Sequence, residues 1–179
     1  MAKILVTISN GFEEIEAVSI IDICRRAGIE VVTAGVEDKV LIGAHSIKIE
    51  MDKRVDEVNS SDFDMIVLPG GLPNAFTLAD DNDVQRLLKE FEEKNKIGAI
   101  CAAPYALHKA GVLNQNYTCY PSFEKKIKDD GYQDDKNVVT DNNVITSRGP
   151  ATAIDFALEI VKTLKGNDIY HQIKTGLLA

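Results

Sequence analysis

The chain has 179 residues, enough for one domain with a substantial hydrophobic core. Hydrophobic residues make up 45% and charged residues 27%, and the net charge of −8 argues against binding to nucleic acid or to an anionic membrane surface. The sequence contains no apolar run near the roughly 18 residues needed to cross a bilayer and no segment that resembles a signal peptide, so we expect a cytoplasmic protein.

The N-terminal part is predicted to form a strand, a helix and a second strand. Residues 4–9 are apolar and rich in strand-forming side chains. Residues 13–27 carry apolar side chains at helical spacing, with acids in the first turn and arginines in the last. Residues 30–34 form the second strand. A strand, a helix and a strand over about 30 residues make a βαβ unit, which implies a parallel sheet.

The middle of the chain adds a hairpin, a strand and a helix. Residues 40–42 and 47–51 are short apolar runs around Gly43, and their alternation predicts a hairpin at the edge of the sheet. Residues 64–68 are an unbroken apolar run, typical of a central strand. Residues 83–94 have one apolar stripe and are predicted to form an amphipathic helix.

The C-terminal part mixes short strands with helices. We expect a short strand at 117–120, a charged helix or turn at 123–131, a hairpin of 138–139 with 144–146, a strong helix at 151–165 and a last helix at 168–178. No internal repeat, low-complexity tract or linker interrupts the sequence, so residues 1–179 are interpreted as a single domain.

A cysteine lies between a predicted strand and a predicted helix. Residues 97–100 are apolar and end at Cys101, and Pro104 suits the first turn of a helix. Ala99 and Ala103, two residues before and after the cysteine, are small enough for a sharp nucleophile elbow. The elbow would place the sulfur at a helix N-terminus, where the thiol pKa should fall. An inert, buried packing cysteine is the alternative interpretation.

Two further loops follow predicted strands at the same edge of a parallel sheet. Gly70 and Gly71 have no side chain to obstruct their N–H groups, which together with that of Ala102 are predicted to form an oxyanion hole. The alternative is that the glycines only turn the chain. Glu16 lies among apolar residues, so we expect it to face inward, with a raised pKa. Its neighbours Glu13 and Glu14 are interpreted as surface acids.

The sequence predicts neither a metal site nor a disulfide framework. The 3 cysteines are odd in number and widely spaced, and the 3 histidines form no H-E-x-x-H pair. His108 is seven residues after Cys101, about 10 Å along a helix and too far for a hydrogen bond. His45 and His171 are interpreted as surface or packing residues.

Four motifs resemble the ThiJ/PfpI superfamily, and within it the DJ-one branch, the Parkinsonism-associated deglycase type. They occur in the same order, at 11–16 (GFEEIE), 67–71 (VLPGG), 99–104 (AICAAP) and 146–150 (TSRGP). The resemblance spans nearly the whole chain. It implies a flavodoxin-like, doubly wound α/β fold, with a mostly parallel sheet sandwiched between helices, and a homodimer.

The resemblance also implies roles for individual residues. Cys101 would be the nucleophile and an oxidation-prone thiol, and Glu16 a protonated carboxyl that hydrogen-bonds it. Arg148 would line the pocket mouth near the dimer partner. The backbone N–H groups at the site would be those of Gly70, Gly71 and Ala102.

Two positions depart from the superfamily pattern. The peptidase-like branch resembles a cysteine followed by histidine, whereas here Ala102 follows, which disfavours a peptidase or amidase. Much of the DJ-one branch has a His-Pro pair near the thiol, and here the matching pair is Tyr120-Pro121. A phenol with a pKa near 10 is a poor proton shuttle at neutral pH, so Glu16 or a water would carry the proton transfer.

Two functions follow from these observations. The first is a cofactor-free glyoxalase or deglycase, in which the Cys101 thiolate adds to methylglyoxal, glyoxal or their early adducts. The second is an oxidative-stress sensor or chaperone, in which peroxide oxidises Cys101. Both functions predict a reaction of the Cys101 thiol with a small molecule or an oxidant. Neither predicts a metal, a nucleic acid or a membrane as a partner.

Overall fold

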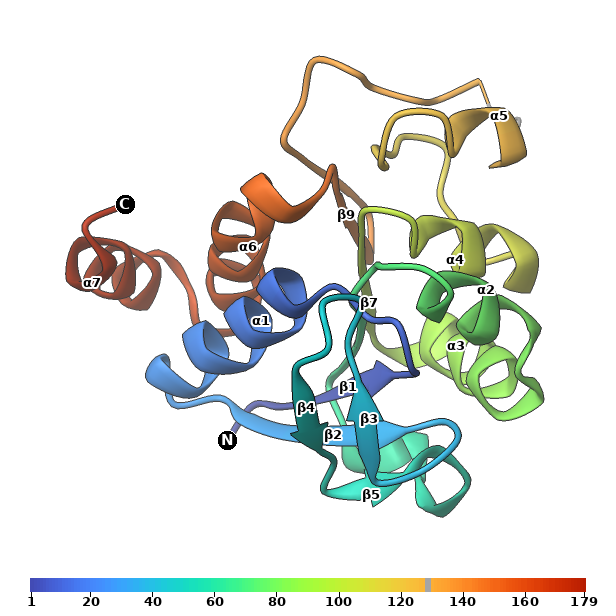
Figure 1. Ribbon diagram of the computed structural model, residues 1–179. Coiled ribbons are helices and arrows are strands. Elements are labelled where there is room, and N and C mark those ends of the chain that lie inside the picture. Colours follow the sequence, from blue (N-terminus) through green and yellow to red (C-terminus); the bar gives the residue numbers. More distant parts are fainter. Residues whose placement is uncertain (128–129) are drawn as a thin grey trace.

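A seven-stranded, mostly parallel sheet forms the centre of the molecule (Figure 1). The computed structural model describes residues 1–127 and 130–179. The strands lie in the order β5-β2-β1-β6-β7-β9-β8, and β8 is antiparallel to β9. Their bounds are β1 (Lys3–Ile8), β2 (Glu30–Gly35), β5 (Lys53–Arg54), β6 (Met65–Leu68), β7 (Lys96–Ile100), β8 (Val138–Asp141) and β9 (Val144–Ser147).

Helices cover both faces of this sheet, which confirms the predicted flavodoxin-like sandwich (Figure 1). On one face lie α1 (Glu14–Arg26) and α6 (Ala153–Lys165), with α7 (Asn167–Leu177) against α6. On the other face lie α2 (Asn74–Asp80), α3 (Asn82–Lys94) and α4 (Pro104–Ala110). The short α5 (Glu124–Ile127) follows beyond α4. Because both faces are covered, β6 is buried at every position, as its unbroken apolar sequence predicts.

The parallel order brings three strand ends to one edge of the sheet. β1 pairs with β2 and with β6, and β6 pairs with β7, all in parallel. The loops after β1, β6 and β7 therefore leave the sheet at the same edge, where α/β proteins form their sites. The predicted βαβ unit, the central position of β6 and the β8–β9 hairpin are confirmed.

Several local predictions are wrong or incomplete. The β3 (Val40–Ile42) and β4 (Lys48–Glu50) hairpin forms its own two-stranded sheet, while β5 occupies the edge of the main sheet. The expected strand at 117–120 is absent, since Tyr117 makes only an isolated bridge to Tyr132. Helix α2 was not predicted from the sequence.

The predicted helix or turn at 123–131 is α5 in part, and residues 128–129 lie outside the described residues. None of the helices in the described part of the chain is long and apolar enough to cross a membrane.

Candidate active site

Cys101 stands on a sharp turn between β7 and α4. Its φ of +65° lies in the left-handed region, which a non-glycine residue adopts only when its surroundings impose it. The Cys101 N–H donates to Ser147 O at 2.9 Å, and its carbonyl accepts the N–H of Tyr120 at 2.8 Å. Ala99 and Ala103 are fully buried on either side. The geometry is the nucleophile elbow that the small flanking residues predict.

The carboxyl group of Glu16 reaches this elbow from the first turn of α1. Glu16 is fully buried, which confirms the inward orientation. Its Oε2 accepts the N–H of Gly70 at 2.7 Å, while Oε1 has no nitrogen or oxygen partner within the described residues. The carboxyl also interacts with the Cys101 thiol, and the charge of Glu13 acts on it. A thiol and a carboxyl therefore face each other in a site largely closed to water.

Burial dominates the electrostatics of this pair. It raises the pKa of Glu16 to about 7, against smaller lowering effects of the hydrogen bonds from Gly70 and Cys101. Burial and the Glu16 carboxylate also raise the pKa of the Cys101 thiol above its ordinary range. The expected fall of the thiol pKa is therefore wrong, because the amides of Gly71 and Ala102 lower it by less. The pair loses one proton near neutral pH and retains the second into the alkaline range.

The glycine loop after β6 lies directly between thiol and carboxyl. A Cβ on Gly70 would lie 2.6 Å from Cys101 Cβ and 2.9 Å from Glu16 Oε2, so only glycine fits. Gly71 has φ +91°, and a Cβ there would lie 2.3 Å from Glu13 N. The glycines thus do more than turn the chain, because they let the backbone approach the site.

The N–H groups of the glycine loop and of the elbow are divided between the two reactive side chains. Those of Gly71 and Ala102 face the Cys101 sulfur, whereas Gly70 N–H is taken by Glu16. The structure therefore differs from a three-amide oxyanion hole and leaves two amides at the sulfur. Sequence reasoning also missed Asn74, which lies fully buried beneath the loop and which no motif marks.

Arg148 and Tyr120 line one cavity of about 300 Å³ at the same edge of the sheet, together with Gly149 and Pro150. The Tyr120 ring lies against Gly149, where a Cβ would be 3.3 Å away, and the residue is 47% exposed. Arg148 donates from Nη1 to the Asp134 carbonyl. Arg148, expected at a pocket mouth, and Tyr120, which stands in place of the histidine, thus line the same cavity.

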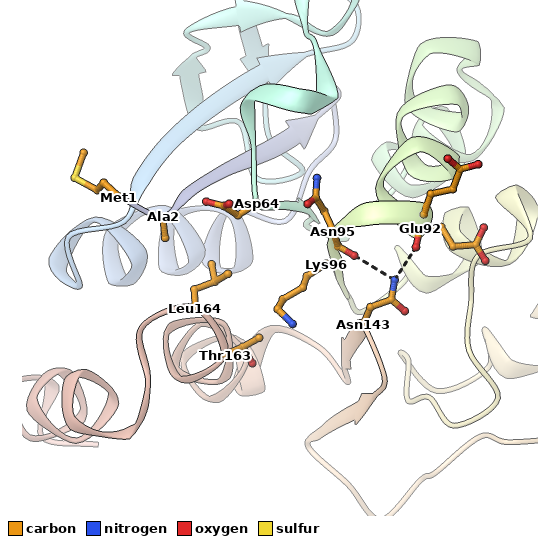
Figure 2. A pocket seen from close by; sticks show the side chains of 10 residues that line it. Met1, Ala2, Asp64, Glu92, Asn95, Lys96, Asn143, Thr163 and Leu164 are labelled. Atoms are coloured by element: carbon orange, nitrogen blue, oxygen red, sulfur yellow. Dashed lines mark hydrogen bonds between the residues drawn. The ribbon is translucent and has the colours of Figure 1, made fainter.

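A larger cavity of about 740 Å³ lies at the opposite end of the sheet (Figure 2). Asp64 and Lys96, at the amino ends of β6 and β7, help to line it, with Asn143 opposite. Because Cys101 follows the carboxyl end of β7, this cavity is remote from the thiol.

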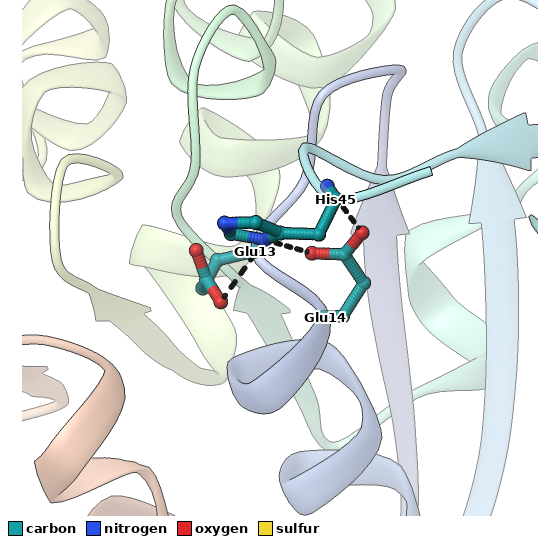
Figure 3. A group of neighbouring side chains, drawn as sticks. All are labelled: Glu13, Glu14 and His45. Atoms are coloured by element: carbon teal, nitrogen blue, oxygen red, sulfur yellow. Dashed lines mark hydrogen bonds and ion pairs between the residues drawn. The ribbon is translucent and has the colours of Figure 1, made fainter. Parts of the chain in front are cut away.

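Glu14 was expected to be a surface acid, and this is wrong, because the residue is only 5% exposed. Its Oε1 accepts the N–H of His45 at 2.6 Å, and its Oε2 lies 2.8 Å from His45 Nδ1 (Figure 3). Glu13 Oε1 is 3.9 Å from the same nitrogen, so the described residues bring three potential metal ligands within 4.8 Å. The hydrogen bonds fasten the loop between β3 and β4 onto the start of α1, and Glu14 raises the pKa of His45.

Comparisons with known proteins agree with this geometry. The protein dj-1beta of Drosophila melanogaster is 40% identical over 178 residues, covering 97% of this chain and 95% of the relative. Its crystal structure superposes with a TM-score of 0.95. The structure named Toxoplasma gondii DJ-1, oxidized, has a TM-score of 0.95 at 35% identity, covering 99% of this chain and 98% of that one.

A Caenorhabditis elegans relative carries an activity in its name. The glutathione-independent glyoxalase DJR-1.2 is 38% identical over 156 residues, covering 86% of this chain and 83% of the relative. The sequence model of the DJ-1/PfpI family matches residues 2–163. Since the match spans most of the chain and the fold agrees throughout, the chain belongs to the DJ-1/PfpI family.

Proposed function

We propose that the protein is a cysteine-dependent, cofactor-free glyoxalase or deglycase acting on methylglyoxal, glyoxal or their early adducts. The observation that carries this proposal is the pairing of the Cys101 thiol with the buried Glu16 carboxyl. A carboxyl with a pKa of about 7 exchanges protons readily at neutral pH. The named activity of the worm glyoxalase supports the same chemistry.

The first step is addition of the sulfur to the aldehyde carbon of methylglyoxal. Glu16 accepts the thiol proton, a carbon–sulfur bond forms, and the carbonyl π electrons move onto oxygen. The amides of Gly71 and Ala102, which face the sulfur, stabilise the resulting oxyanion. Protonation of that oxyanion gives a hemithioacetal.

The second step is an internal redox exchange between two carbons. Glu16 removes the hydrogen on the former aldehyde carbon, and the enediol that forms is protonated on the neighbouring carbon. The first carbon is thereby oxidised to a thioester and the second reduced to an alcohol, so no external oxidant or reductant is needed. Water then cleaves the thioester, which releases lactate and restores the thiol. Overall, methylglyoxal and one water give lactic acid.

A test of this proposal is lactate formation from methylglyoxal in the absence of glutathione. We expect turnover in the native protein and its loss in Cys101→Ser. The matched control is Cys119→Ser, which alters another buried cysteine and should keep most activity. Absence of lactate from the native protein, or full turnover in Cys101→Ser, would overturn the proposal.

A homodimer is the assembly that we propose for this enzyme. Large apolar side chains of α1 and the β3–β4 hairpin are exposed in the single chain, among them Ile15 at 58%, Val18 at 49% and Ile47 at 53%. Such side chains at an assembly surface would be removed from water. Size-exclusion chromatography with light scattering should give twice the mass of the chain, and a monomer at micromolar concentration would contradict it.

A second candidate function, a redox sensor or chaperone, is favoured by a difference in exposure. Cys101 is 8% exposed, whereas Cys24 and Cys119 are fully buried. The Toxoplasma relative has been described in an oxidised form. A peroxide pulse followed by peptide mass spectrometry should oxidise Cys101 first. Equal oxidation of all three cysteines would exclude a tuned sensor.

A further inference from the structure

We propose that Asn74 is a positioning residue that aims the amide groups of the glycine loop at Glu16 and Cys101. The inference rests on the proposed function for its catalytic consequence. The structural part of the inference does not depend on any substrate, because it concerns the ionisation of the Cys101 thiol and the Glu16 carboxyl.

The Asn74 side chain is fully buried, and both ends of its amide are used. Nδ2 donates to the carbonyl of Pro69 at 2.7 Å and to that of Gly70 at 2.9 Å. Oδ1 accepts the N–H of Ser9, directly after β1, at 2.7 Å. One side chain thus ties the loop after β6 to the end of β1.

These two carbonyls belong to the peptide units whose N–H groups serve the site. In a trans peptide the carbonyl oxygen and the next residue's N–H point in opposite directions. Holding Pro69 O therefore sets the direction of Gly70 N–H, which donates to Glu16 Oε2 at 2.7 Å. Holding Gly70 O in the same way sets the direction of Gly71 N–H, which faces the Cys101 sulfur.

The loop needs this support because its own residues provide little. Gly70 and Gly71 have no side chains, and glycine is the residue with the widest choice of backbone conformations. Gly70 O has one further donor, the N–H of Glu13 at 3.0 Å. Pro69 O accepts a side-chain hydrogen bond from Asn74 Nδ2.

The chemistry of the contacts requires an amide at position 74. Two carbonyl oxygens face Nδ2 and one N–H faces Oδ1, so the side chain must both donate and accept. Aspartate has the same shape but would place an oxygen against the two carbonyls. An apolar side chain would leave buried polar groups without partners.

The test is the pH dependence of Cys101 alkylation by iodoacetamide, measured by peptide mass spectrometry in the full-length protein. The native profile should have an inflection near pH 7, where the pair loses its first proton. In Asn74→Ala the Gly70 and Gly71 amides lose their alignment. Because both amides lower the pKa of their partners, the inflection should move upward by about half a pH unit or more, and alkylation at pH 7 should slow at least ~3-fold.

Methylglyoxal turnover is the second readout. We expect kcat to fall about tenfold or more while KM changes less than about threefold, since misaligned amides stabilise the oxyanion poorly. If the native protein has no turnover, the proposed function fails, but the alkylation profile still decides the role of Asn74.

The matched control is Asn95→Ala, which removes an asparagine whose Nδ2 also donates to a carbonyl, that of Phe63 at 2.9 Å. Asn95 lies at the opposite end of the sheet (Figure 2). Its loss should lower stability without moving the inflection. An unchanged profile in folded Asn74→Ala, or an equal shift in Asn95→Ala, would overturn the proposal.

Two further measurements apply if Asn74→Ala does not fold. Asn74→Ser keeps a small polar side chain and should show the same upward shift in weaker form. In the native protein, the side-chain amide resonances of Asn74 should follow the inflection near pH 7 in an NMR titration, because Gly70 links them to Glu16. Resonances that stay constant through that range would contradict the proposal.

Discussion

Replacing Glu16 with glutamine should make the protein more stable above neutral pH. The pKa of this fully buried carboxyl rises from 4.5 to about 7 on folding. A group whose folded pKa is raised adds stability below its unfolded pKa and loses it as pH rises through the folded value. The native protein should therefore lose stability from this group between pH 4.5 and about 7, because the buried carboxyl must ionise.

The expected size of this effect is about 3 kcal/mol, since the shift is about 2.5 pH units and each unit corresponds to ~1.4 kcal/mol. Glutamine is neutral at all pH values, and its oxygen keeps the Gly70 N–H satisfied. Glu16→Gln should thus gain about 2.5 kcal/mol relative to the native protein between pH 5 and pH 8, because part of the full effect is already present at pH 5.

Urea denaturation at pH 5 and pH 8 measures this gain directly. Glu93→Gln, which alters an exposed glutamate, is the control and should shift stability little at either pH. Glu16→Gln should also lose methylglyoxal turnover by about 100-fold or more, because glutamine cannot move a proton. A stability difference that is equal at both pH values would refute the raised pKa.

Two further substitutions probe the glycine loop and the hairpin anchor. Gly70→Ala should reduce lactate formation at least ~10-fold, because the added Cβ would lie 2.6 Å from Cys101 Cβ. Initial rates of lactate formation measure the loss, and circular dichroism distinguishes it from unfolding. Native-like turnover would contradict the prediction. His45→Ala removes the imidazole that faces the buried Glu14 carboxylate and should lower the melting temperature. Because the pKa of His45 is raised in the folded protein, the loss should be larger at pH 6 than at pH 9; scanning calorimetry at both values tests this, and a larger loss at pH 9 would reverse the sign.

Much of the fold was predictable because its strands are buried on both faces. The unbroken apolar run of β6 and the helical stripe of α3 (Asn82–Lys94) each have a single structural solution at their length. The edge was harder to predict. The β3–β4 hairpin has the apolar–polar alternation of an edge strand. Whether it joins the main sheet or forms a separate two-stranded sheet depends on tertiary contacts, which the local sequence does not encode.

Most residues of the site could be predicted from the sequence, but the direction of the thiol pKa shift could not. The small residues Ala99 and Ala103 indicated the elbow, and Glu16 was expected to face inward. The direction of the thiol pKa was wrong, because a helix N-terminus is visible in sequence while burial beside a carboxylate is not. Asn74 was missed for the same reason, since its importance comes from contacts with the ends of two strands.

The most direct test of the central claim is to follow the Cys101 adduct itself. Native protein and Glu16→Gln are mixed with methylglyoxal without glutathione, quenched at increasing times, and analysed by intact mass and peptide mapping. We expect the native adduct on Cys101 to be transient and followed by lactate, whereas in Glu16→Gln it should accumulate without lactate. An adduct that never forms on Cys101, or that turns over at the native rate in Glu16→Gln, would contradict a thiol–carboxyl mechanism.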